Sequence, residues 1–403
     1  MTGVSETAGL EPGPASRADA RIVAAGAALS VVSIATFLLL PQFVEASVVD
    51  LHFTEGQVGL LSALNLGGTT ISSVASVLWV RRCSWRMAAS LGLLGLLAVN
   101  VASMFCHGVV PFLALQGVTG LFAGSLYSLS LIVLSDCQRP DRGFAYAIGA
   151  QTVYQIFALV AGPFMIHHGG VNAMLGLFSG LCVIGALLVV HLPAHGRIAR
   201  ATTTGPGLLH APALFALAGC FLFYVNISSY WTYIERIGTT AGLGLNAVSN
   251  SLAFGTAASM GGVFLATWLG FRRGLLMPIA VSTVAIILAV LMLTGTLQLT
   301  AYVISAVIYG NAWNLSMTYQ YSTVNAVDRS RRGVALAPAF HNAGGAAGPA
   351  IAALFVSEHD HSSVIWIVIV SVLASLGCFM IALRLGARAA AAEASAARAA
   401  AVP

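Results

Sequence analysis

Runs of about twenty apolar residues recur along this chain, and the short segments between them hold nearly all of its charges. Only 8% of the 403 residues are charged and 58% are hydrophobic, whereas a soluble domain carries about 25% charged residues. Lipid must therefore surround most of the surface. Backbone that crosses lipid has to satisfy its own hydrogen bonds, as helices and closed barrels do. Because the runs lack the two-residue alternation of barrel strands, they are predicted to be transmembrane helices.

The apolar runs predict twelve helices and hence an all-α integral membrane protein. The expected ranges are 22–46, 57–80, 87–106, 109–134, 144–166, 172–192, 211–234, 245–269, 274–295, 299–323, 334–356 and 363–384. The remaining residues predict a disordered tail (1–20), a linker (193–210) and an Ala-rich tail with a frayed end (386–403).

The charges predict an orientation in the membrane. The chain has no lysine, and all 18 of its arginines except Arg236 fall on one side if both termini are cytoplasmic. Basic residues collect on the cytoplasmic side of membrane proteins. Acidic residues fall on the other side, at Glu45, Asp50, Glu55, Glu358 and Asp360. We therefore expect a multi-pass protein with both termini cytoplasmic, and the arginine-only, alanine-rich composition indicates a bacterial inner membrane.

The chain also repeats itself after about half of its membrane portion. Arg142-Gly143 recurs as Arg332-Gly333, and Glu45 has a counterpart in Glu235. This repeat predicts two six-helix bundles, residues 21–192 and 211–385. Duplicated bundles are typical of transporters, because a site between two similar halves can open to each side in turn.

Local patterns along essentially the whole chain resemble those of the major facilitator superfamily. The loop after the second helix is similar to G-x-x-x-D-R-x-G-x-x-R of that family and keeps Arg81 and Arg86, which the resemblance assigns to a gating loop. Ser76, Val80 and Cys83 replace the two glycines and the acid. The acid that normally clamps the cytoplasmic gate in this family is therefore missing.

Two further helices carry the resemblance. The fourth is similar to R-x-x-x-G-x-x-x-G, although Gln116 replaces the arginine that many relatives use in proton coupling. The fifth is similar to the G-x8-G-x3-G-P pattern of the family's antiporters, here Gly149, Ala158, Gly162 and Pro163. The segment 230–238 is similar to bacterial efflux permeases. The resemblance implies the major facilitator fold and transport by alternating access, with efflux as the expected direction.

Polar and aromatic residues form stripes on several predicted helices. In this family, helices 1, 4, 7 and 10 line a central cavity and helices 5 and 11 contribute to it, so the resemblance directs these stripes inward. The candidate substrate-binding residues are Gln116, Tyr127, Gln151, Tyr154, Gln155, Tyr224, Asn226, Trp231, Trp313, Asn314, Gln320 and His341. Contact between helices is the alternative for any one of them. Aromatic and amide groups favour a neutral, amphipathic or aromatic solute, because polyanions require buried arginines.

Three ionisable residues are candidates for proton coupling, because an ionisable group in hydrocarbon is costly and usually functional. His341 lies well inside its helix, and histidine changes charge near neutral pH. Glu45 and Glu235 are expected at the outer ends of the first and seventh helices. The alternatives are a neutral imidazole bonded to a neighbouring helix and an ion pair at the membrane surface.

The predicted function is proton-coupled efflux of a small amphipathic or aromatic compound, with uptake of an organic nutrient as the alternative. An enzyme would need a nucleophile, a metal set or paired carboxylates, and a sensor would need a soluble output domain; neither is evident. The six cysteines show no metal-binding or disulfide spacing. We expect no cofactor, metal or nucleic acid, and a monomer whose partners are the solute, protons and the lipid bilayer.

Overall fold

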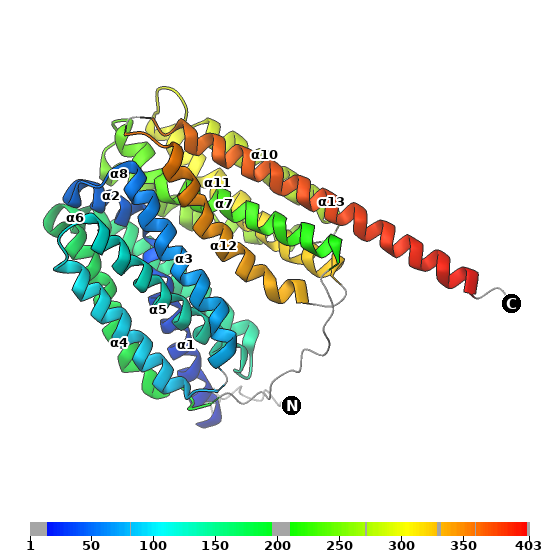
Figure 1. Cartoon of the computed structure of the whole chain (residues 1–403), viewed down its shortest axis with the longest axis horizontal. Helices are drawn as coiled ribbons and strands as arrows, with labels where there is room; N and C mark the ends of the chain where they lie inside the picture. Colours follow the sequence, from blue (N-terminus) through cyan, green and yellow to red (C-terminus); the bar gives the residue numbers. More distant parts are fainter. Residues whose placement is uncertain are drawn as a thin grey trace, which may run out of the picture.

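The computed structural model describes residues 14–80, 82–195, 210–270, 272–328, 332–358 and 360–400. In these ranges every regular element is a helix, and the helices form two bundles that lie side by side (Figure 1). Eight described helices are long and apolar enough to be membrane spans, and Arg142–His191, with 50 residues, is long enough for two crossings. Residues 1–13, 196–209 and 401–403, which belong to the predicted tails and linker, lie outside the described residues. So do Arg81, Arg197, Arg200, Arg329 and Arg331.

The N-terminal bundle contains six crossings. One crossing combines α1 and α2, and two crossings merge in α6 on either side of Gly170, whose φ of 54° glycine adopts without strain. The elements are α1 (Pro14–Leu38), α2 (Leu40–Leu51), α3 (Glu55–Trp79), α4 (Trp85–Met104), α5 (Val109–Ser135), α6 (Pro140–Leu188) and the 3-10 helix η1 (Val189–His191).

The C-terminal bundle also contains six crossings, one of which is interrupted at Ser259. Its elements are α7 (Ala211–Thr240), α8 (Leu245–Ala258), α9 (Met260–Leu269), α10 (Leu276–Leu291), α11 (Leu299–Val327), α12 (Arg332–Phe355) and α13 (Ser362–Ala400). The prediction of twelve helices in two bundles of six is confirmed.

Two helix ends differ from the prediction. The seventh helix was expected to end at residue 234, but α7 continues to Thr240, so Glu235 and Arg236 lie inside it. The tail from residue 386 was expected to fray, but α13 continues to Ala400. Alanine has the highest helix propensity of all residues, so an Ala-rich segment readily extends a helix that precedes it.

Pro41 interrupts the first crossing. Proline has no N–H, and its ring clashes with the carbonyl group four residues earlier, which here belongs to Phe37. The backbone leaves helical geometry at Leu39, with φ −106° and ψ 18°. The carbonyl oxygens of Phe37 and Leu38 accept hydrogen bonds from side chains of other helices instead.

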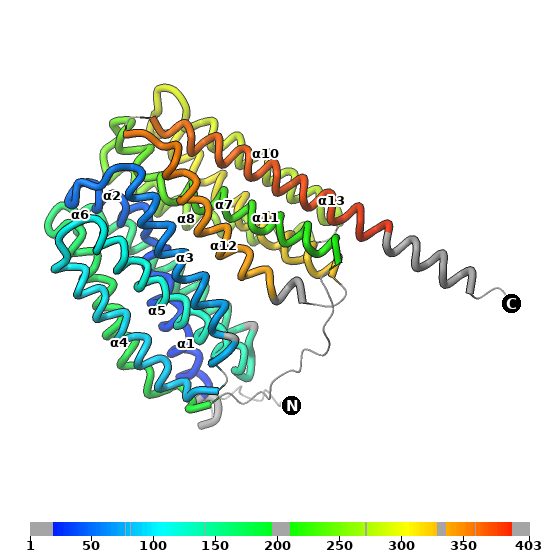
Figure 2. The backbone as a smooth tube through the Cα atoms, viewed as in Figure 1, coloured from blue at the N-terminus to red at the C-terminus, as the bar shows by residue number. Residues whose placement is uncertain are grey.

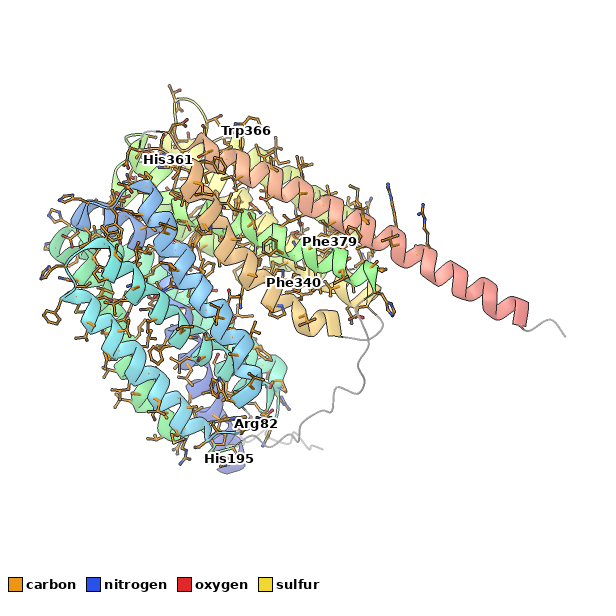
Figure 3. All side chains as sticks on the ribbon, in the orientation of Figure 1. Arg82, His195, Phe340, His361, Trp366 and Phe379 are labelled. Carbon is orange, nitrogen blue, oxygen red and sulfur yellow. The ribbon has the colours of Figure 1, made fainter. Side chains whose placement is uncertain are left out.

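The bundles are joined at one end and separate at the other. One hydrophobic cluster contains residues of both bundles, among them Phe43 and Tyr233. Two others each belong to one bundle: the first surrounds Trp85 and the second Phe379. In Figure 2 the bundles accordingly meet near α2 and α8 and diverge away from them. His361 marks the end where they meet, which we call the joined end, whereas Arg82 lies at the opposite, arginine-rich end (Figure 3).

Candidate functional site

A cavity of about 250 Å³, the central cavity, lies between the two bundles at mid-helix depth. Both bundles line it, and none of its described lining residues carries a charge. Its polar and aromatic lining includes Asn65, Tyr127, Gln151, Tyr224, Trp313 and Asn342. Four of these residues, Tyr127, Gln151, Tyr224 and Trp313, are predicted substrate-binding residues.

Several donors in the central cavity have no partner in the part of the protein that the structure describes. Among the described residues, no hydrogen bond reaches the side chains of Tyr127, Gln151, Tyr224, Trp313 or Asn342. An unpaired polar group inside a protein costs about 1–3 kcal/mol. Phenol, indole and amide groups around an empty space can therefore hold a solute that supplies acceptors and an aromatic face.

A second cavity of about 270 Å³, the side cavity, lies between α6, α8, α9 and α11. Predicted residues Gln155, Trp231 and Asn314 line it, together with Gln151 and Trp313 of the central cavity. Part of its wall is a stacked pair of tyrosines, Tyr230 and Tyr309, with ring centroids 3.6 Å apart.

Two hydrogen bonds connect both cavities to the interruption of the first crossing. The indole N–H of Trp231 donates to the Phe37 carbonyl oxygen at 2.8 Å, which links α7 to α1 across the bundle interface. The amide of Gln155 donates to the Leu38 carbonyl oxygen at 3.2 Å. The carbonyl groups of Phe37 and Leu38, next to the helix break at Pro41, therefore bind one side chain from each bundle at the wall of the cavities.

A buried ion cluster closes the joined end. Arg236 of α7 pairs with Glu45 of α2 at 3.1 Å and with Glu55 at the start of α3 at 2.5 Å. Glu45 also accepts a hydrogen bond from Thr239 at 3.2 Å. The acids belong to one bundle and the arginine to the other, so the cluster can hold the bundles together only while this end stays closed.

Further contacts around Glu55 extend the cluster. The hydroxyl of Tyr233 donates to the Glu55 carbonyl oxygen at 2.9 Å, and His361 Nε2 lies 3.4 Å from the Glu55 carboxylate. Just before α13, Asp360 accepts hydrogen bonds from the N–H and hydroxyl of Ser362, which hold the pKa of its carboxyl below the ordinary value. These bonds fix the segment that carries His361.

Glu235 is fully buried and takes no part in this cluster. Its Oε1 accepts a hydrogen bond from Ser249 at 3.0 Å, and its Oε2 has no partner among the described residues. Ser249 in turn accepts from Gln42 of the other bundle at 3.1 Å. Gain or loss of a proton at Glu235 would therefore change the hydrogen bonds that connect Glu235, Ser249 and Gln42 across the two bundles.

His341 lies behind the wall of the central cavity rather than in it. Its ring stacks on Tyr224 at a centroid distance of 4.4 Å, and its Nδ1 lies 3.1 Å from the Tyr321 hydroxyl. The side chain is 2% exposed, and Nε2 has no partner among the described residues. His341 thus contacts the candidate site through Tyr224.

The other predicted residues lie apart from both cavities. Gln116 contacts Ser103, Asn226 accepts from Tyr309, and Gln320 donates to Ser316. Tyr154 lies next to the hydrophobic cluster shared by the bundles, and its hydroxyl has no partner among the described residues. A direct role for these four in binding stays a prediction.

The predicted gating loop is described only in part. Arg86 donates to the Leu192 carbonyl oxygen within its own bundle, and Arg81 lies outside the described residues. Next to the N-terminal part of α6, a third cavity of about 950 Å³ is lined by Asp19, Arg139 and Arg142. Among the described side chains, no group of three His, Cys, Asp or Glu residues could hold a metal ion.

Sequence reasoning missed the partners that define this site. Asn342 lines the central cavity, and Glu55 was placed at the outer end without its partner Arg236. Asn342 follows His341 directly, so the polar pair in a helix of small residues was an available signal. The pairing of Glu55 with Arg236 joins residues far apart in the chain, and no local pattern indicates it.

Comparison with known proteins identifies the same architecture. The sequence pattern of the Major Facilitator Superfamily matches residues 25–337. No curated protein sequence matches the chain. Among solved structures, a mutant of the nucleoside transporter NupG gives a TM-score of 0.74 at 12% identity, over 91% of this chain and 99% of that one.

Two other solved structures are also similar. An inward-facing, unoccupied bacterial homolog of the human lysosomal transporter Spinster gives a TM-score of 0.66 at 12% identity, over 94% of this chain and 98% of that one. A D-xylose-proton symporter gives 0.70 at 13% identity, over 89% and 96%. At identities this low, the likeness establishes the fold alone.

Proposed function

Because the chain belongs to the major facilitator superfamily of transporters, we propose that it moves a small, neutral, amphipathic or aromatic solute across a bacterial inner membrane by alternating access. One observation carries this proposal: between the two bundles lies a cavity whose described lining residues are uncharged and include unpaired donors, and an ion cluster of described residues joins the bundles at one end. With both termini cytoplasmic, the joined end faces outward and the arginine-rich end faces the cytoplasm.

Efflux coupled to protons is the first candidate, because the fifth helix carries a pattern similar to that of the family's antiporters. Uptake of a small organic nutrient is the second, favoured by a fold shared with a D-xylose-proton symporter. For the proton we assign Glu235 before His341. A buried carboxylate is costly unless it binds a proton when, as for Glu235, the described residues offer it one donor and no cation, and Glu235 lies on the bond chain between the bundles.

Transport into proteoliposomes with an imposed pH gradient tests the proposal. A panel of neutral aromatic and amphipathic compounds should include at least one whose flux follows the gradient, and the sign of the gradient that drives it gives the direction. Glu235→Gln should abolish gradient-driven flux but retain exchange of solute. If Glu235→Gln and His341→Ala both leave gradient-driven flux intact, the assigned coupling residues are wrong.

A further inference from the structure

The side cavity is bordered by apolar residues at its rim. Ile148 of α6 and Met260 and Val263 of α9 line it and are 55%, 36% and 40% exposed. All three lie within the candidate spans Arg142–His191 and Leu245–Leu269. No water is available in the bilayer core, so exposed apolar side chains on the outside of a bundle at this depth contact acyl chains.

Ser259, at this rim, lies between α8 and α9 and keeps helical backbone angles, with φ −62° and ψ −18°. α8 ends at Ala258 and α9 begins at Met260, and the amide of Asn314 donates to the carbonyl and hydroxyl oxygens of Ser259 at 3.0 and 3.1 Å. α6 packs along α8, whereas no comparable packing joins α6 to α9 in these described helices. The side cavity therefore extends toward the bilayer between α6 and α9.

The side and central cavities share a wall. Leu38, Gln151 and Trp313 line both. Each cavity alone, at about 270 and 250 Å³, is smaller than ligand pockets of roughly 300–1,000 Å³, but together they reach that range. The two cavities are therefore adjacent, and a ligand that reaches past these residues into both would have the space of an ordinary ligand pocket.

The polar groups of the two cavities differ in what they leave unpaired. In the side cavity, Gln155 already donates to Leu38, Thr152 to Ile148 and Asn314 to Ser259. Gln151 and Trp313, whose side chains have no partner among the described residues, also line the side cavity, so its apolar part is the rim formed by Ile148, Met260 and Val263. In the central cavity the phenol, indole and amide donors have no protein partner among the described residues. The rim and the central cavity suit an apolar tail and a polar aromatic head, respectively.

We propose that the solute is an amphiphile that binds across both cavities and exchanges with the bilayer through the gap between α6 and α9. Its polar head binds at Gln151, Tyr224 and Trp313, and its apolar tail lies against Met260 and Val263. This inference rests on the proposed function, because the head occupies the central cavity assigned there to the solute.

Photolabelling of the full chain in proteoliposomes tests the inference. The probe is an N-alkyl nicotinamide, which is a neutral aromatic amide, with a diazirine at the end of its tail; cross-linked residues are located by mass spectrometry. Cross-links are expected at Ile148, Met260 and Val263. They should be lost in Thr256→Trp, which fills the side cavity, and retained in Leu265→Trp, which adds the same side chain to an exposed position outside it. Equal unfolding temperatures of the two variants would show that Thr256→Trp is folded.

Competition identifies the occupant. Nicotinamide without a tail should reduce labelling, because the head of the probe and the competitor share the central cavity. Labelling that phospholipid displaces and nicotinamide does not would assign the side cavity to an acyl chain and overturn the inference. Cross-links confined to the exposed stripe of Val153 and Phe157, or unchanged in Thr256→Trp, would also overturn it. In that case, gradient-driven flux of a tailless compound is measured in the wild type and in Thr256→Trp. Equal flux in both proteins would support the proposed function even though the inference had failed.

Discussion

Arg236 is the arginine that the charge distribution sets apart, and its contacts explain why. It lies at the joined end, away from the other arginines, because two buried acids of the opposite bundle neutralise it. A buried ion pair contributes little over apolar packing, but removing one partner leaves an uncompensated charge. The stability of the closed end therefore depends on Arg236 staying paired with these two acids.

Replacing Arg236 by Gln should lower the free energy of unfolding by about 3–5 kcal/mol, because Glu45 and Glu55 then remain buried without the arginine that pairs with both. The apparent Tm of the purified protein measures this effect. Arg273→Gln, at an exposed position, is the control and should leave the Tm unchanged. A triple variant with Glu45→Gln and Glu55→Gln added should recover part of the loss. An unchanged Tm in Arg236→Gln would contradict the burial of the cluster.

Gln151 is one of three residues that line both cavities. Gln151→Leu removes a donor and an acceptor that have no protein partner among the described residues, so solute affinity should fall roughly two- to tenfold, the effect of one net hydrogen bond. Binding of a transported compound to purified protein measures it. Gln116→Leu makes the same change in a buried residue away from both cavities and should leave affinity unchanged. If Gln116→Leu lowered the affinity more than Gln151→Leu, the solute would bind nearer to Gln116 of α5 than to the two cavities.

At the scale of elements, α3 and α12 approach closely only because glycine stands at the contact. A Cβ at Gly59 would lie 2.4 Å from the Tyr233 hydroxyl and 2.6 Å from the Ala353 Cβ. At Gly67, on the same face of α3, a Cβ would meet the Ala346 Cβ at an ordinary 3.9 Å. The contact is therefore tighter near the joined end than toward the middle of the helices.

Gly59→Ala should hold the joined end apart, at a cost of about 1–3 kcal/mol for overpacking of the closed state. The expected result is slower transport and faster thiol labelling of a cysteine placed at Thr239, which contacts Glu45 in the closed cluster. Gly67→Ala is the matched control and should behave like the parent protein. Equal labelling rates in both variants would show that this contact does not govern closure.

At the scale of the whole molecule, the three largest hydrophobic clusters among the described residues support two rigid bundles that move relative to each other. The clusters around Trp85 and Phe379 each stay within one bundle, so they can persist while the bundles rotate. The cluster shared by the bundles and the Arg236 contacts have to separate when the joined end opens. The cavities lie between these regions, where rotation changes access most.

Spin labels can follow this motion in a cysteine-free background. Labels at Arg82 and Arg273, exposed at the arginine-rich ends of the two bundles, should move closer when Arg236→Gln weakens the joined end. Labels at the exposed positions Val49 and Ala241 should move apart in the same variant. Pulsed dipolar spectroscopy measures both distances. Distances that rise together at both ends would indicate separation of the bundles without rotation.

The sequence by itself determined the solvent, the element type and the duplication. Apolar runs long enough to cross a bilayer must be helical, because only a helix satisfies its backbone within one segment. The matched Arg-Gly pairs and the correspondence of Glu45 with Glu235 located the two halves, and the stripes on α6 and α11 indicated Gln151 and Trp313. These are local properties, since they depend on residues that are neighbours in the chain or on one helix.

Only the tertiary structure decided which polar residues meet. It paired Arg236 with Glu45 and Glu55, placed His341 behind Tyr224, and left Gln116 outside the cavities. It also showed that the carbonyl groups released by Pro41 bind Trp231 and Gln155. These contacts join residues more than a hundred positions apart or depend on how helices rotate about their axes. Hydropathy and spacing carry no information about that rotation, because packing against neighbouring helices sets it.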